Sequence, residues 1–248
     1  MTIRAKRSLL GACVVGCGVA VLAACSSSSS SPSTSNTGAA TTGAATSASA
    51  ATPASLAQLK TLVLQSADLP SGWKGTPHQP DQNEAADNAA MAQCIVARNT
   101  DGDKFADANS DDFANGNATI SSSATSYKSQ SDLDSDIQML HSSKLSGCFE
   151  QMIKKQLASS LPAGSTIEST SISITPGSGG GPSNVVATGT GTIKVKASGQ
   201  EVAVYLTVAF ITGPLIEAEV DAQNVGSPVP ASVVNPLVSA VATRAAQG

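Results

Sequence analysis

The chain has 248 residues, of which 14 are basic and 18 are acidic, so its net charge is −4. Residues 1–24 hold three of the basic residues and no acidic one, which leaves 11 basic against 18 acidic residues and a net charge of −7 for the rest. An acidic surface argues against nucleic acid or an anionic membrane surface as the binding partner.

The first 24 residues have the pattern of a secretory signal peptide. Arg4, Lys6 and Arg7 form a positive segment, and residues 9–23 are apolar or small. About 15 such residues are too few for a comfortable transmembrane helix, which needs about 20. We therefore expect residues 1–24 to direct export and to be removed.

The sequence Leu22-Ala23-Ala24-Cys25 follows this segment and resembles the lipobox of bacterial lipoprotein precursors. The resemblance implies a diacylglyceryl thioether on the Cys25 sulfur, cleavage before Cys25 and acylation of the new amino terminus. Two or three acyl chains give stable anchoring, whereas a single chain binds a bilayer only marginally. The alternative is an ordinary signal peptide cut at Ala24, with Cys25 incidental. We expect a protein anchored by lipid at the extracytoplasmic face of the cell membrane.

Residues 26–53 contain serine, threonine, alanine, glycine, asparagine and two prolines, with no charge and no large apolar side chain. Such a composition cannot bury enough surface to fold, so residues 25–53 are expected to form a lipidated, flexible tether. Hydroxyl-rich tethers of actinobacterial lipoproteins are often glycosylated, and this segment resembles them; a bare linker is the alternative. Residues 54–248 then remain as a single domain.

Two cysteines remain after export and lipidation. Cys13 and Cys17 leave with the signal peptide, so Cys94 and Cys148 are an even pair in an oxidising compartment. A metal or redox pair is the alternative, but it lacks the CxxC spacing and a nearby histidine. We predict a structural disulfide.

The first half of the domain has mainly helical periodicity. A helix is predicted over residues 53–66, where Thr52-Pro53 is a start signal and leucines recur on one face. Trp73 follows in a turn, where it either lines a ligand site or, as is more usual for a lone tryptophan, covers the end of the core. A polar loop over residues 76–83 and a second helix over 84–98 come next.

Residues 99–107 are acidic and invite comparison with a calcium-binding loop. If Asn99 were position 1, position 6 would be Lys104 and position 12 would be Ser110, where an EF-hand needs glycine and a bidentate glutamate. We expect a solvated loop instead. A strand is predicted over residues 118–127 and a long helix over 131–158.

In the second half the period changes from 3.6 to 2. Strands are predicted over residues 166–175, 185–196, 202–210 and 215–222, and a closing helix carries Val233, Leu237 and Val241. The fold class is therefore α+β, with an antiparallel β-meander sheet of about four or five strands and helices packed on one face. The long helix is expected to bend near Gly147.

Taken together, the lipobox, the tether, the Leu69-Pro-Ser-Gly-Trp73 turn, the helix bearing Cys148 and the meander resemble small mycobacterial and other actinobacterial lipoproteins. The order from Thr119 onward also resembles the extracellular sensor domain of PknH-type mycobacterial kinases. The resemblance implies an envelope-facing domain with a ligand-binding cleft. The chain has one cysteine pair, where that domain has two.

Three classes of function fit these observations. The first is a non-catalytic binding module for an envelope lipid, glycan or small signal, with Trp73, Gly189, Gly191 and Phe210 as the predicted site. The small residues there should leave room between the sheet and the long helix. The second is a lipoprotein that docks on a membrane complex.

The third and weakest is an envelope hydrolase. It would need a carboxylate pair such as Asp111 and Asp112, or Glu217 and Glu219, which the alternation of the strands places on a solvent face. The sequence shows no nucleophile motif and no cluster of metal ligands. We expect no enzyme activity, no cofactor and no metal.

Overall fold

The fold is described from a computed structural model, in which residues 51–161, 164–197 and 199–248 are described. The expected signal peptide at residues 1–24, Cys25 and the tether up to residue 50 lie outside the described residues. No helix in the described part of the chain is long and apolar enough to cross a bilayer.

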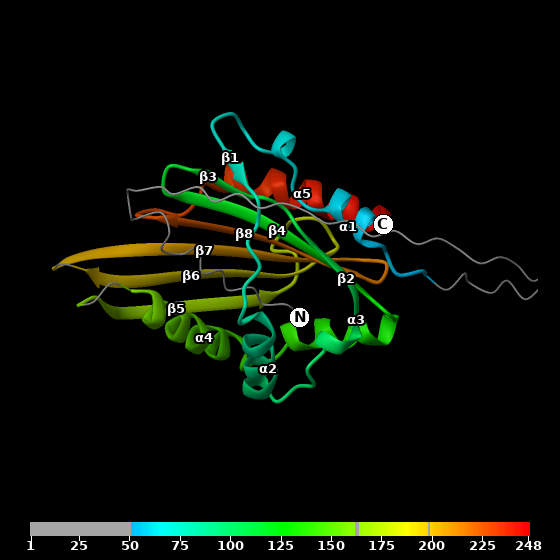
Figure 1. The fold of residues 1–248 in the computed structure, drawn as a ribbon, viewed down its shortest axis with the longest axis horizontal. Coiled ribbons are helices and arrows are strands. Elements are labelled where there is room, and N and C mark those ends of the chain that lie inside the picture. Colours follow the sequence, from blue (N-terminus) through cyan, green and yellow to red (C-terminus); the bar gives the residue numbers. More distant parts are fainter. Residues whose placement is uncertain (1–50, 162–163, 198) are drawn as a thin grey trace, which may run out of the picture.

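Eight antiparallel strands form one sheet in the order β1-β3-β4-β8-β7-β6-β5, and β2 pairs with β4 (Figure 1). The strands are β1 (Lys74–Thr76), β2 (Lys104–Asn109), β3 (Asp112–Asn115), β4 (Ala118–Tyr127), β5 (Thr166–Pro176), β6 (Val185–Ala197), β7 (Gln200–Gly213) and β8 (Ile216–Val225). The helices are α1 (Leu56–Leu62), α2 (Glu84–Ile95), α3 (Gln130–Leu140), α4 (Leu145–Ser160) and α5 (Ala231–Gln247). The predicted α+β class and the meander β5 to β8 are confirmed.

The sheet has more strands than the sequence analysis expected. Strands β1, β2 and β3 were not predicted. β1 ends at the start of the predicted polar loop over 76–83, β2 overlaps the acidic loop over 99–107, and β3 lies in a segment to which we assigned no element. They are short and polar, so their burial pattern contains no apolar alternation that could have revealed them. They pair on the β4 edge of the sheet and widen it.

Helices cover both faces of the sheet, not one as predicted. Along β7, Val208 and Phe210 belong to one hydrophobic cluster, while Ala209 and Ile211 belong to the other. Because successive side chains of a strand point to opposite faces, the two clusters lie on opposite sides of the sheet.

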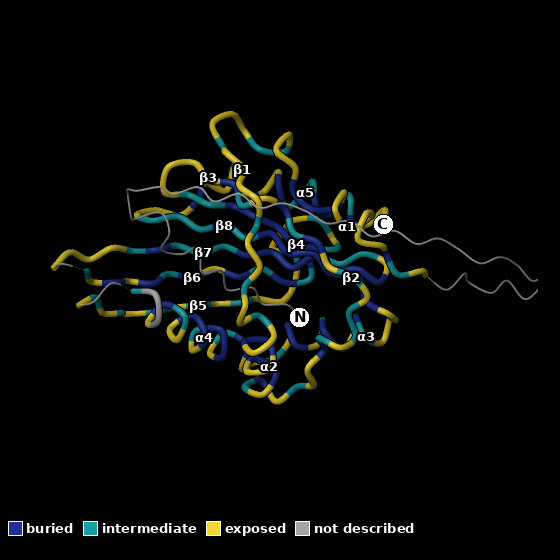
Figure 2. Tube along the Cα trace, viewed as in Figure 1, coloured by how far each residue is buried: buried dark blue, intermediate teal, exposed yellow. Residues whose placement is uncertain are grey.

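The first cluster contains residues of α1 and α5, and we call its side the α5 face. The second contains residues of α2, α3 and α4, and we call its side the α4 face. Figure 2 shows buried residues along the strands of the central sheet and exposed residues at its hairpin ends.

The predicted long helix is two helices. α3 ends at Leu140 and α4 begins at Leu145, so the break precedes Gly147, which lies inside α4. The Ser129 hydroxyl accepts a hydrogen bond from the Asp132 backbone N–H and caps α3, so this helix begins before the predicted start at residue 131. Similarly, α1 begins after Ser55 in a capping box rather than at residue 53.

Cys94 and Cys148 form the predicted disulfide, with their Cα atoms 5.8 Å apart. The bond joins α2 to α4, which also pack against each other. Met91 and Ile95 of α2 lie in the cluster of the α4 face. The disulfide therefore fixes α2 to the helix that covers this face.

Candidate functional site

The structure does not bring the four predicted ligand residues together. Trp73 is partly buried against the cluster of the α5 face. Gly189 and Gly191 lie on the α4 face of β6, where Phe210 of β7 is fully buried. Trp73 is therefore separated from the other three by the sheet.

The space over the two glycines is already filled. A Cβ atom at Gly189 would lie 2.6 Å from Cγ1 of Val208, and one at Gly191 would lie 3.2 Å from Cγ1 of Ile172. Real Cβ atoms avoid contacts this short, so side chains from the neighbouring strands already occupy the positions above β6. The expected opening between helix and sheet is not present at these residues.

The structure corrects the placement of Glu217 and Glu219, which are buried on the α4 face rather than exposed. Tyr127, fully buried at the end of β4, donates its hydroxyl to Asp136 at 2.5 Å and also lies 3.1 Å from Glu217. Asp136 of α3 also accepts from the Thr100 hydroxyl at 2.5 Å. This buried network connects α3 and the segment after α2 to the centre of the sheet.

Burial raises the pKa of the Tyr127 phenol, and the neighbouring Glu217 carboxylate raises it further. An unfolded tyrosine has a pKa of about 10, so the stability contributed by the neutral phenol is fully present below that pH and lost above it. We expect the urea midpoint of the wild type to fall as the pH rises above about 10, and that of Tyr127→Phe to fall less. Equal losses in the two proteins would contradict this assignment.

Among the carboxylate pairs considered for a hydrolase, Asp112 has a histidine partner. Nδ1 of His78 lies 3.3 Å from both of its carboxylate oxygens. Within the described ranges, no group of three His, Cys, Asp or Glu side chains is arranged to hold a metal ion.

A groove of about 310 Å³ lies on the α5 face of strands β5, β6 and β7. Helix α5 packs on β7 and β8, which leaves the neighbouring part of this sheet face open. The side chains that line the groove are mostly hydroxyl-bearing, and we call it the hydroxyl groove. Its lining comprises Ser171, Ser173, Thr190, Thr192, Tyr205 and Thr207, with Gly191, Leu206 and Pro228.

The hydroxyl side chains form two rows across the three strands. Ser171 pairs with Thr192, which pairs with Tyr205. Ser173, Thr190 and Thr207 form the second row in the same way. Neighbouring strands are about 4.8 Å apart, so a ligand in the groove would meet a regular array of hydroxyl groups.

The two rows explain why the sequence did not reveal this groove. Glycine and threonine alternate in β6, which is the predicted strand, but the predicted site lay on its glycine side. The open side is the threonine side. Whether a helix far away in the sequence covers a sheet face cannot be seen in the sequence of the strand itself. Of the four predicted residues, only Gly191 borders the groove.

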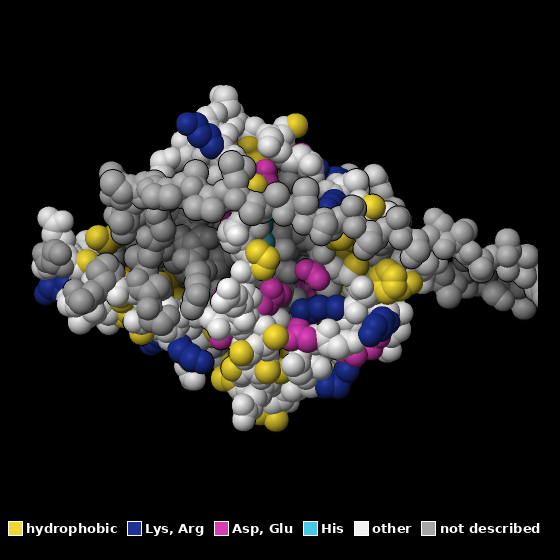
Figure 3. Space-filling view, viewed as in Figure 1, with side chains coloured by type: hydrophobic (Ala, Val, Ile, Leu, Met, Phe, Trp, Pro, Cys, Tyr) yellow, Lys and Arg dark blue, Asp and Glu magenta, His cyan; other side chains and the backbone are white. Residues whose placement is uncertain are grey.

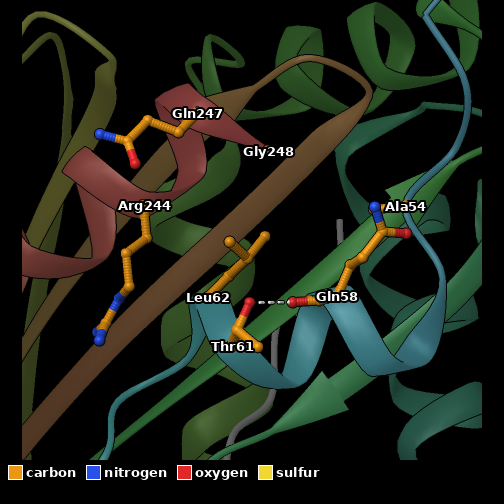
Figure 4. Close-up of a pocket in the computed structure, with 7 residues that line it drawn as sticks. All are labelled: Ala54, Gln58, Thr61, Leu62, Arg244, Gln247 and Gly248. Atoms are coloured by element: carbon orange, nitrogen blue, oxygen red, sulfur yellow. Dashed lines mark hydrogen bonds between the residues drawn. The ribbon is translucent and has the colours of Figure 1, made fainter.

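A second pocket, of about 340 Å³, lies between α1 and the end of α5 (Figure 4). Its Arg244 guanidinium is bound by the two carboxylate oxygens of Asp68, at 2.9 and 3.3 Å. Thr61 donates its hydroxyl to the backbone carbonyl of Gln58 at 2.7 Å. The Arg244 and Thr61 side chains of this pocket therefore already bind protein partners.

No protein-family model matches the chain, and no curated protein matches its sequence. Its structure is similar to the crystal structure of the extracellular domain of PknH from Mycobacterium tuberculosis, with a TM-score of 0.42 and 9% sequence identity. The match covers 77% of this chain and 97% of that domain. Similarity at this level does not support inferences about ligands, so the proposals below rest on the residues of this chain.

Proposed function

We propose that the protein is a lipoprotein anchored through Cys25 at the extracytoplasmic face of the cell membrane. Its folded domain would be a non-catalytic module that binds an envelope glycan in the hydroxyl groove. The observation that carries the proposal is the pair of hydroxyl rows on a sheet face that α5 leaves open.

The chemistry of the groove fits a sugar better than a lipid chain. Each serine, threonine or tyrosine hydroxyl can both donate and accept a hydrogen bond, as the hydroxyls of a sugar do. An acyl chain would instead remove water from these hydroxyls and offer no hydrogen bonds in place of those that the hydroxyls make to water. The groove therefore favours a polyhydroxylated ligand.

Charge near the groove is largely balanced. Lys194, two residues after the groove residue Thr192 on β6, forms an exposed ion pair with Glu201 at 2.9 Å. The six hydroxyl side chains of the groove are neutral. These features support a neutral glycan as the ligand.

The disulfide supports the export part of the proposal. Disulfides form and persist mainly in oxidising compartments, and Cys94 and Cys148 are joined in the structure. The pair therefore agrees with a domain that folds outside the cytoplasm.

The double variant Thr190→Val, Thr207→Val tests the groove. Valine keeps the shape of threonine but removes its hydroxyl, and each lost neutral hydrogen bond costs about 0.5–1.5 kcal/mol of binding free energy. We expect affinity for neutral oligosaccharides retained by the wild type on a glycan array to fall roughly tenfold or more.

Thr175→Val is the matched control. Thr175 pairs with Thr188 next to the hydroxyl rows but does not line the groove. This variant should bind as the wild type does. If the wild type retains no oligosaccharide, or if the double variant binds equally well, the glycan proposal is wrong and docking on a membrane complex becomes the better explanation.

The variant Cys25→Ala tests the anchor. Without the thiol the acyl chains cannot be attached, so the protein should move from the membrane fraction to the soluble fraction. Immunoblotting of salt-washed membranes measures the change. Retention of Cys25→Ala in the washed membranes would contradict lipid anchoring.

A further inference from the structure

Two large apolar side chains are exposed at the end of the molecule that carries α1 and β2. Phe105 of β2 is 56% exposed, and Leu56 at the start of α1 is 48% exposed. Figure 3 shows hydrophobic side chains on the surface at the end where Figure 1 places α1 and β2. Single exposed apolar residues are common, but exposed apolar residues in the same region of a surface mark interaction sites.

A local irregularity of the sheet exposes Phe105. In the pairing of β2 with β4, Lys104 lies opposite Tyr127 and Ala106 lies opposite Ser126, so Phe105 between them has no partner. A β-bulge of this kind changes the direction of a side chain and is commonly a functional feature of a strand. Here it places a phenyl ring in solvent while Ala106 packs against the core of the α5 face.

The two residues lie where the folded domain begins. The Ser126 hydroxyl lies 2.8 Å from the carbonyl oxygen of Ala54 and 3.4 Å from that of Ala106. Ala54 is two residues before Leu56, and Ala106 follows Phe105. Helix α1 also packs against β2. The chain therefore enters the domain beside both exposed side chains.

We propose that Phe105 and Leu56 form a membrane-contact surface that rests in the interface of the bilayer to which Cys25 is attached. The inference rests on the proposed anchoring. Cys25 precedes Ala54 by 29 residues, and a chain of that length spans at most roughly 100 Å. This covalent link lets this end of the domain reach the lipid surface and keeps it there at high effective concentration.

Apolar insertion, not charge, drives the contact. Outside residues 1–24 the chain has a net charge of −7, which does not favour an anionic surface. Next to Phe105, Lys104 is paired with Asp101 at 2.6 Å. An aromatic ring and a leucine side chain are the groups that enter the interface of a neutral bilayer.

The contact also orients the domain. In Figure 1 the end of β6 and the start of β7 lie at the opposite end of the sheet from α1. A domain that rests on its α1 and β2 end directs these strand ends away from the bilayer. Strands β5 to β7, which carry the hydroxyl groove, would then extend into the envelope, where a glycan is reachable.

The test uses the lipidated protein in phosphatidylcholine vesicles with brominated acyl chains. Single variants Phe105→Trp and Leu56→Trp report depth, because bromine quenches only a tryptophan that enters the bilayer. Val202→Trp is the control, since Val202 is 37% exposed near the start of β7. The wild-type signal from Trp73 is subtracted. We expect quenching at positions 105 and 56 to be several-fold stronger than at 202.

Flotation of the same samples separates the two proposals. If the protein does not float with vesicles, the anchoring proposal fails. If the protein floats but tryptophans at 105 and 56 are quenched no more than the one at 202, the membrane-contact surface is wrong while the anchor stands. Protection of the tryptophan at 105 in native membranes but not in protein-free vesicles would assign the surface to a protein partner and also overturn the inference.

Discussion

Replacing Asp136 by alanine is expected to lower the free energy of unfolding by roughly 2–4 kcal/mol, because two buried hydroxyls lose their short hydrogen bonds to its carboxyl group. Those hydroxyls belong to Tyr127 and Thr100, and each lies 2.5 Å from an Asp136 oxygen. A hydrogen bond between buried groups is not replaced by water when one partner is removed, whereas a surface hydrogen bond is. The loss should appear as a lower urea midpoint with an unchanged slope.

Asp134→Ala on the same helix is the matched control. Asp134 is exposed and accepts a hydrogen bond from Gln130 at 2.8 Å, so its removal should change stability by less than about 0.5 kcal/mol. Similar midpoints for the Asp136 and Asp134 variants would show that the buried network contributes little. A reduced slope for Asp136→Ala would instead indicate that α3 detaches before the rest of the domain unfolds.

The part of the fold that the sequence predicts well is the part with a strong local period. Strands β5 to β8 alternate apolar and polar side chains, and their connections contain glycine or proline. Strand β3 has four residues and only Phe113 is buried in it, so nothing in its own sequence separates it from a loop. Its pairing with Ile120 of β4 stabilises it, and that contact is not visible in the local sequence.

Local sequence patterns also could not predict that helices cover both faces of the sheet. In β8, Ile216, Ala218 and Val220 face α5, and the alternating acidic positions were therefore assigned to solvent. Alternation separates two faces but does not say whether a distant segment covers the second. Glu217 is buried beside Tyr127, whose hydroxyl also bonds to Asp136 of α3.

The candidate site shows the same limit. Small residues such as Gly189 suggested room for a ligand, yet Val208 and Ile174 occupy that room. A glycine in a strand indicates close approach of a neighbour as often as it indicates a cavity. The hydroxyl groove depends on where α5 stops covering the sheet, which is a property of tertiary packing.

The disulfide gives the second large effect. Replacing Cys94 and Cys148 by alanine should lower stability by about 4 kcal/mol in the loop-entropy model, because the bond closes a loop between residues 54 positions apart. For a domain of this size, that loss corresponds to a decrease in Tm of about 8–16 °C. Differential scanning calorimetry measures it.

Loss of the disulfide should first destabilise α2. Helix α2 packs on α4 and contributes Met91 and Ile95 to the cluster, so without the disulfide it depends on a small apolar contact. Amide exchange in α2 should accelerate before exchange in β7 and β8 at the centre of the sheet. A reducing agent should reproduce both effects in the wild type and leave the double alanine variant unchanged. If reduction of the wild type alters neither Tm nor α2 exchange, the disulfide does not stabilise the folded domain.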